Sequence, residues 1–120
     1  MNMSMKTFKD IIAWQKGYVL TLRIYQLTAH FSHCEEFGLK SQLRRAAVSV
    51  ISDIAEGFKR RSKKDQLHFY NQAQSSIEEI KCQVLLARDL EYLKPNEFQE
   101  VDALAVESAR ILYAWISSQK

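Results

Sequence analysis

The sequence contains little proline, glycine or cysteine. Its 120 residues include one proline and three glycines, where average usage of about 5% and 7% would supply roughly six and eight. Because β-sandwiches and barrels need many turn residues, this scarcity argues against them and favours long helices. Hydrophobic residues make up 47% and charged residues 26% of the chain, which are the proportions of an ordinary globular protein. The length predicts a single domain spanning residues 1–120.

Long apolar runs and a set of cysteines suited to disulfides are also missing. No run approaches the roughly 18–20 residues of a membrane span, and the first ten residues contain no signal-peptide apolar region. We therefore expect a cytoplasmic protein without membrane contact. Cys34 and Cys82 are too few to staple a small secreted fold and are expected to stay reduced.

Apolar residues recur at intervals of three or four along most of the chain, which is the spacing of helices. Ser62 followed by Asp65 is typical of a helix start, and Pro95 is tolerated in a first helical turn. The predicted helices span about residues 10–31, 38–61, 63–92 and 96–118. Long helices joined by short loops predict an all-α fold, an antiparallel up-down-up-down four-helix bundle.

The first predicted helix is apolar around much of its circumference. One stripe at helical spacing consists of Ile11, Trp14, Tyr18, Leu22, Tyr25 and Ala29. A second apolar set, which lies off that stripe, consists of Ile12, Val19, Leu20, Ile24 and Leu27. Because a monomer would not bury both sets, we expect the protein to self-associate.

Positive charge is concentrated in residues 38–64. This segment carries eight cations and two acidic residues, so its net charge is +6, whereas the whole chain carries +3. The eight cations, which are our candidate nucleic-acid-binding residues, are Lys40, Arg44, Arg45, Lys59, Arg60, Arg61, Lys63 and Lys64. Five of them lie between residues 59 and 64, at a helix end and the following turn, where free backbone donors of the next helix also attract phosphate.

The basic run has a simpler interpretation as well. Cations at the end of a helix interact favourably with its dipole and keep a protein soluble without binding anything. The aromatic residues Phe58, His68, Phe69 and Tyr70 flank the run but do not interrupt it. Base stacking is therefore possible, although contacts with a phosphate backbone are the stronger expectation.

A polar stripe follows the second predicted helix. Arg45, Ser49, Asp53 and Glu56 stand three or four residues apart, and Arg60 continues the series. If the stripe is buried, an Arg45–Asp53 network through Ser49 would specify packing or oligomer register. If it lines a groove or pore, the same groups could contact a ligand. The sequence leaves both alternatives open.

Motifs of catalysis and cofactor binding are not found. The sequence has no glycine-rich phosphate loop, nucleophile elbow or HExxH motif, and the adjacent Glu78 and Glu79 diverge by about 100° on a helix. His30, His33 and Cys34 lie close in sequence, but the further ligands of a zinc site are not at the usual spacing. We therefore expect no enzymatic activity, no cofactor and no bound metal.

Three blocks of the sequence resemble one protein family. The blocks are residues 8–16 (FKDIIAWQK), residues 36–50 (EFGLKSQLRRAAVSV), and residues 54–57 (IAEG) with Arg60 and Ser62. In this order they resemble the four-helix-bundle proteins encoded in intervening sequences of bacterial 23S ribosomal RNA genes. The resemblance implies a bundle that assembles as a ring, typically a homopentamer. In architecture this ring is similar to the accessory variability protein of diversity-generating retroelements, which binds RNA and a reverse transcriptase through a basic surface.

The resemblance sharpens the functional expectation. It implies that the cations are repeated around a ring and that RNA is favoured over DNA as the partner. Two positions depart from the family pattern: Asp53 replaces a usual Asn, and Gln74-Ser75 replaces a frequent Gly-Ser pair. We expect a non-catalytic oligomer that binds nucleic acid through its basic surface. The alternative is a structural or adaptor ring that recruits a protein partner without contacting nucleic acid.

Overall fold

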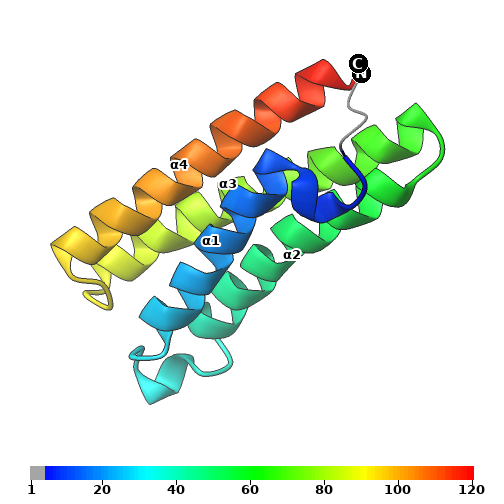
Figure 1. The fold of residues 1–120 in the computed structure, drawn as a ribbon. Helices are drawn as coiled ribbons and strands as arrows, with labels where there is room; N and C mark the ends of the chain where they lie inside the picture. Colours follow the sequence, from blue (N-terminus) through cyan, green and yellow to red (C-terminus); the bar gives the residue numbers. More distant parts are fainter. Residues whose placement is uncertain (1–4) are drawn as a thin grey trace.

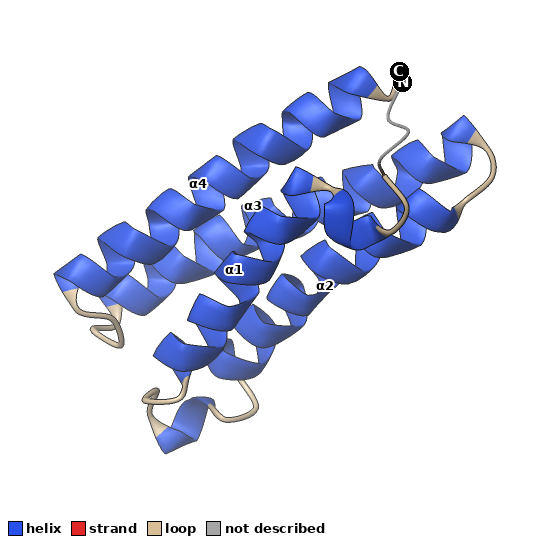
Figure 2. Ribbon diagram, in the orientation of Figure 1, coloured by secondary structure: helices blue, strands red, loops and turns tan. Residues whose placement is uncertain are grey.

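The computed structural model describes residues 5–120, and all regular structure in this range is helical (Figure 2). Two short 3-10 helices accompany four long α-helices: η1 (Phe8–Asp10), α1 (Ile12–Thr28), η2 (His33–Glu35), α2 (Leu39–Lys59), α3 (Lys63–Asp89) and α4 (Pro95–Ser118). The predicted all-α fold with four helices is therefore confirmed. The starts of α2, α3 and α4 lie within one residue of their predicted positions.

The four helices form a closed square of neighbours. α1 packs against α2 and α4, and α3 packs against the same two helices, whereas within residues 5–120 the Cα atoms of neither diagonal pair of helices come within 8 Å of each other. Figure 1 shows the chain reversing direction at each connection, consistent with the up-down-up-down order. The α2–α3 turn and the end of α4 lie at one end of the bundle, and the α3–α4 turn lies at the other (Figure 1). No helix in the described range combines the length and the apolar character needed to cross a membrane.

The hydrophobic core lies along the axis enclosed by the four helices, and each helix contributes large apolar side chains to it. The largest fully buried side chains include Leu20, Ile24, Leu43, Ile54, Tyr70, Ile77, Ile80 and Leu112. Burial of each such side chain contributes about 1.5–3 kcal/mol. Ala46 and Ala73 are fully buried as well, and their small side chains allow α2 and α3 to approach each other closely.

The helix α1 differs from the first predicted helix in its ends and its orientation. α1 begins at Ile12 rather than at about residue 10, because Asp10 belongs to η1, and it ends at Thr28 rather than at residue 31. Phe31 leaves the helix and packs against Tyr92, with 5.2 Å between the ring centroids. The residues of α1 that face the core are Ala13, Gly17, Leu20, Thr21, Ile24, Leu27 and Thr28. Most of the first predicted apolar stripe therefore faces outward.

The outward face of α1 consists of five exposed apolar residues, Ile12, Tyr18, Val19, Leu22 and Tyr25. Between 39% and 53% of each residue is accessible to solvent. As the sequence suggests, the single chain does not cover the apolar surface of its first long helix. Self-association through this face is still a prediction.

The connection between α2 and α3 is short and tightly packed. α2 ends at Lys59, Arg60 adopts an extended backbone (φ −70°, ψ 148°), and the Ser62 hydroxyl accepts a hydrogen bond from the Asp65 amide at 3.1 Å. Ser62 thereby caps α3, as its position in the sequence predicts. Gly57 lies directly against the ring of Tyr70, so α2 and α3 are in close contact up to the turn.

Candidate nucleic-acid interface

The eight candidate binding residues lie in two separate groups. Lys40, Arg44 and Arg45 lie in the first two turns of α2, at the end of the bundle away from the α2–α3 turn. The other five, Lys59, Arg60, Arg61, Lys63 and Lys64, flank the α2–α3 turn and are called the basic turn below. At 1.5 Å per residue, about 22 Å of helix axis separates Arg45 from Arg60. The structure therefore does not gather the eight cations into one patch.

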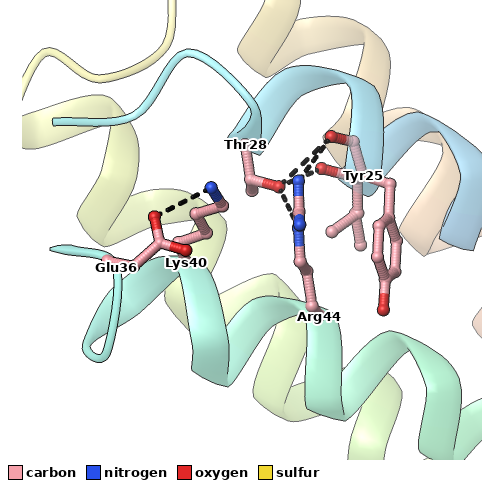
Figure 3. A network of polar contacts seen from close by, with 6 residues as sticks. Tyr25, Thr28, Glu36, Lys40 and Arg44 are labelled. Carbon is pink, nitrogen blue, oxygen red and sulfur yellow. Dashed lines mark hydrogen bonds and ion pairs between the residues drawn. The ribbon is translucent and has the colours of Figure 1, made fainter. Parts of the chain in front are cut away.

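Arg44 connects α2 to the end of α1 (Figure 3). Its Nε donates a hydrogen bond to the buried Thr28 hydroxyl at 2.9 Å, and its Nη2 donates to the carbonyl oxygen of Tyr25 at 3.0 Å. The guanidinium carbon also lies 4.4 Å from the centre of the Tyr25 ring. These contacts occupy two of the five N–H donors of Arg44 and satisfy a carbonyl in the last turn of α1. Its role is to hold two helices together.

Lys40 and Arg45 are neutralised by carboxylates of the same chain. Lys40 Nζ lies 3.0 Å from Glu36 Oε1 (Figure 3). Arg45 Nη2 lies 2.7 Å from Glu79 Oε2 on α3 and donates to Gln42 Oε1 at 2.7 Å. In the first group, Arg44 alone has no carboxylate partner in the described range, and its guanidinium contacts Thr28 and Tyr25 of α1.

The polar stripe of α2 lies along the boundary between α2 and α3. Arg45 pairs with Glu79 of α3 rather than with Asp53, so the Arg45–Asp53 network does not form among residues 5–120. Ser49 and Asp53 are half-buried, whereas Glu56 is exposed. Burial, and secondarily the charge of Glu56, raises the pKa of Asp53 above its ordinary value. The stripe is thus a half-exposed contact line between two helices rather than a buried network.

The basic turn is the largest uncompensated group of cations in the described part of the chain. All five of its residues are exposed, and within residues 5–120 only Arg60 among them makes an ion pair. Lys63 Nζ lies 3.3 Å from the carbonyl oxygen of Lys120. Residues 56–65 contain five cations and two acidic residues, Glu56 and Asp65. A positive surface of this kind attracts phosphate groups.

Arg60 is held in one orientation by its neighbours. Its Nη2 lies 2.8 Å from Glu56 Oε2, and its guanidinium carbon lies 4.5 Å from the centre of the Phe69 ring. Its backbone amide donates to the carbonyl of Gly57 at 3.1 Å, and its own carbonyl accepts a hydrogen bond from Gln66 Nε2 at 3.1 Å. Sequence reasoning identified Phe69 as a flanking aromatic residue but missed this stacking, because the stacking depends on how α3 folds back onto α2.

The histidine and cysteine residues do not assemble a metal site in the part of the chain that the structure describes. No group of three or more His, Cys, Asp or Glu side chains suited to a metal ion occurs there. Both cysteines are exposed and free, and Cys34 Sγ lies 3.1 Å from Ser32 Oγ. His30 instead lines an open groove of about 900 Å³ beside the α3–α4 turn, together with Arg88, Glu91 and Phe98. This groove lies at the end of the bundle away from the basic turn and does not extend it.

Known proteins match the chain in fold and in sequence. A crystal structure of a protein of unknown function from the S23 ribosomal protein family of Bacteroides thetaiotaomicron superposes with a TM-score of 0.83. It is 22% identical and covers 91% of this chain and 98% of its own. No curated protein matches the chain. The model of the 23S rRNA-intervening sequence protein family matches residues 9–114, which include nearly all of the three sequence blocks that suggested this family. The chain therefore belongs to the 23S rRNA-intervening sequence protein family.

Proposed function

We propose that the protein is a non-catalytic, cytoplasmic RNA-binding protein that acts as a homo-oligomer and contacts RNA through the basic turn. The observation that carries this proposal is the charge of Lys59, Arg61, Lys63 and Lys64, none of which pairs with an Asp or Glu side chain in the described range. Lys63 contacts only the main-chain oxygen of Lys120, at 3.3 Å. Exposed cations of this kind, next to the start of a long helix, favour a polyanion. RNA is favoured over DNA by the architectural resemblance to the accessory variability protein, which binds RNA through a basic surface.

The proposed interface is smaller than the eight residues that the sequence suggests. Arg44 is committed to the end of α1, and Lys40 and Arg45 are paired with Glu36 and Glu79. A phosphate would have to compete with these carboxylates for Lys40 and Arg45, and with Thr28 and Tyr25 for Arg44. We therefore assign the contact to the basic turn and a packing role to Arg44.

Assembly into an oligomer would strengthen the attraction of the basic turn for RNA. The outward face of α1, together with the exposed Val48 of α2, provides apolar area that a second copy could bury. In a closed homo-oligomer every copy presents the same basic turn, so the positive field increases with the number of copies. The resemblance to ring-forming relatives supports a homopentamer as the form of the assembly.

The test compares two charge reversals of equal size. Arg61→Glu with Lys64→Glu changes the basic turn, and Lys94→Glu with Arg110→Glu changes exposed cations elsewhere by the same amount. Binding to a structured RNA and to duplex DNA is measured across salt from about 50 to 200 mM. Since each lost phosphate contact lowers the salt slope by about 0.7–0.9, we expect the first pair to lower the slope by about 1.4–1.8.

The control pair should leave binding nearly unchanged, and both variants should retain the helical circular-dichroism spectrum and melting temperature of the parent. Equal effects of the two pairs would show that binding follows net charge rather than the basic turn. Absence of RNA binding by the parent protein at low salt would refute the proposal.

A second candidate function is an adaptor that recruits a protein partner. It is favoured by exposed apolar residues on α3 and α4, outside the face of α1. These residues are Leu85, Leu86, Leu90, Val106 and Tyr113, with 44% to 67% of each accessible to solvent. If the parent protein forms an oligomer but binds no nucleic acid, these residues are the first positions to mutate in a search for protein partners.

A further inference from the structure

The guanidinium of Arg60 lies on the ring of Phe69 at the edge of the basic turn. The guanidinium carbon lies over the ring, 4.5 Å from its centroid, a position in which arginine planes characteristically stack on aromatic faces. The side chain of Arg60 is nevertheless 42% exposed. A guanidinium stacked in this way presents its opposite face to solvent as a flat surface, which agrees with the partial exposure of the side chain.

Three contacts restrain Arg60 in the free protein. Glu56 fixes the guanidinium at 2.8 Å, and Gly57 and Gln66 fix the backbone of Arg60. A group that is already ordered loses little conformational freedom when it binds. Lys59 and Arg61, the neighbours of Arg60 in sequence, make no comparable contacts within residues 5–120.

A second planar group lies beside the first. The ring of His68 is exposed and meets Phe69 edge to face, with 5.4 Å between centroids and an angle of 79° between the planes. One of its ring nitrogens lies 3.3 Å from Gln72 Nε2, which restrains the ring. Two flat side chains therefore adjoin the unpaired cations of the basic turn.

Flat cationic and aromatic groups beside a charged surface suit nucleobases that are not paired. Bases of single-stranded RNA stack on arginine planes and on aromatic rings, whereas a duplex hides its base faces. We propose that the basic turn binds unpaired RNA, with one nucleobase stacked on the open face of Arg60 and adjacent phosphates on Arg61, Lys63 and Lys64. This inference rests on the proposed RNA-binding function and adds the form of RNA that is recognised.

The experiment compares Arg60→Lys with Arg61→Lys. Both substitutions keep the charge, but lysine has no plane on which a base can stack. Three labelled probes of equal length are used: a single-stranded RNA, the same RNA paired with its complement, and a single-stranded RNA backbone with abasic residues. Fluorescence anisotropy at fixed salt gives the affinity for each.

The parent protein should bind the single strand more tightly than the duplex and the abasic strand. Because one stacked base contributes about 1–3 kcal/mol, Arg60→Lys should weaken binding of the single strand by about 5- to 150-fold. It should change binding of the abasic strand by less than about twofold, since the charge is retained. Arg61→Lys should change all three by a similarly small factor.

A purely structural role of Arg60 gives a different result. If Arg60 only closes the turn, Arg60→Lys lowers the melting temperature but leaves the order of the three affinities unchanged. Phe69→Leu provides a second variant, since it keeps an apolar support but removes the ring beneath the guanidinium, and it should weaken binding of the single strand in the same way.

The two proposals fail in distinguishable ways. If the Arg61→Glu, Lys64→Glu pair abolishes binding while Arg60→Lys keeps the parent preference, stacking is refuted and the basic turn is retained as the RNA site. The same conclusion follows if the abasic strand binds the parent as tightly as the single strand. If the parent binds none of the three probes, both proposals are refuted.

Discussion

Gly57 provides a sharp test of the packing beneath the basic turn. A Cβ atom at this position would lie 2.7 Å and 2.9 Å from two ring carbons of Tyr70 and 3.1 Å from the Cβ of Phe69. Tyr70 is 1% exposed and meets Trp115 edge to face, so its ring has little room to move. The change Gly57→Ala therefore forces α2 and α3 apart or displaces a core side chain.

The expected destabilisation is the difference between two opposing effects. Alanine in place of glycine inside a helix contributes about 1 kcal/mol of stability. Inserting a methyl group into a closely packed core costs about 1–3 kcal/mol, and two contacts below 3.0 Å with a buried ring place this site toward the upper end. We expect a net loss of about 1–2 kcal/mol, which lowers the melting temperature of a domain of this size by about 4–8 °C.

Gly17→Ala is a matched control, since Gly17 is also a buried glycine inside a helix. Its new Cβ would lie 3.2 Å from methyl carbons of Ile51 and Val50, so these neighbours need to shift by only a few tenths of an ångström. Thermal unfolding followed by circular dichroism and urea unfolding at pH 7 compare the two variants with the parent. Equal stability of Gly57→Ala and Gly17→Ala would refute the close approach of α2 to Tyr70.

Three further predictions concern a turn and two titrating groups. Glu91 has a left-handed backbone (φ 63°) just after the end of α3, a conformation that glycine adopts more easily than other residues. Glu91→Gly should therefore raise the free energy of unfolding in urea by about 1 kcal/mol, and a decrease would contradict strain at this position. The hydrogen bond from Tyr92 to Glu35 raises the pKa of Tyr92 from 10.0 to about 12. Folding therefore favours the protonated phenol. The contribution of this group to the free energy of unfolding is complete below pH 10 and is lost as the pH rises to about 12. Tyr92→Phe should remove this loss of stability at alkaline pH, which urea unfolding between pH 10 and about 12 measures. Burial raises the pKa of Asp53, so the charged carboxylate lowers the free energy of unfolding at pH values above its ordinary pKa. Asp53→Asn should therefore stabilise the fold at pH 7. The gain should be less than about 1 kcal/mol, because water screens the half-exposed group. The difference in stability between Asp53→Asn and the parent should shrink as the pH falls through the raised pKa. A difference that does not change with pH would contradict burial of the charged carboxylate as its cause.

The number of helices and most of their ends follow from local features of the chain. The apolar spacing requires only neighbouring residues, Ser62 caps α3 with its own hydroxyl, and Pro95 is tolerated at the start of α4. The structure differs where distant residues act. Phe31 leaves the end of α1 to pack against Tyr92, which lies beyond the end of α3 and is far away in the sequence.

The face of α1 that is buried was not determined by the sequence pattern. The stripe through Tyr18 and Leu22 has the spacing of a core face, yet Gly17, Thr21 and Ile24 face the core. Apolar residues surround this helix, so spacing alone does not distinguish one face from another. The close fit of Gly17 against Ile51, and the hydrogen bond from the Thr21 hydroxyl to the Ala47 carbonyl at 3.1 Å, show why this orientation is preferred.

The sequence by itself determined that the chain is a helical bundle with an excess of positive charge in residues 38–64. Only the tertiary structure decided which of these charges are unpaired. Arg44 and Arg45 are engaged by groups on α1 and α3, whereas Arg61 and Lys64 face solvent. Residue type and spacing are local properties, but the pairing of a charge and the burial of a helix face depend on partners that other helices bring into contact.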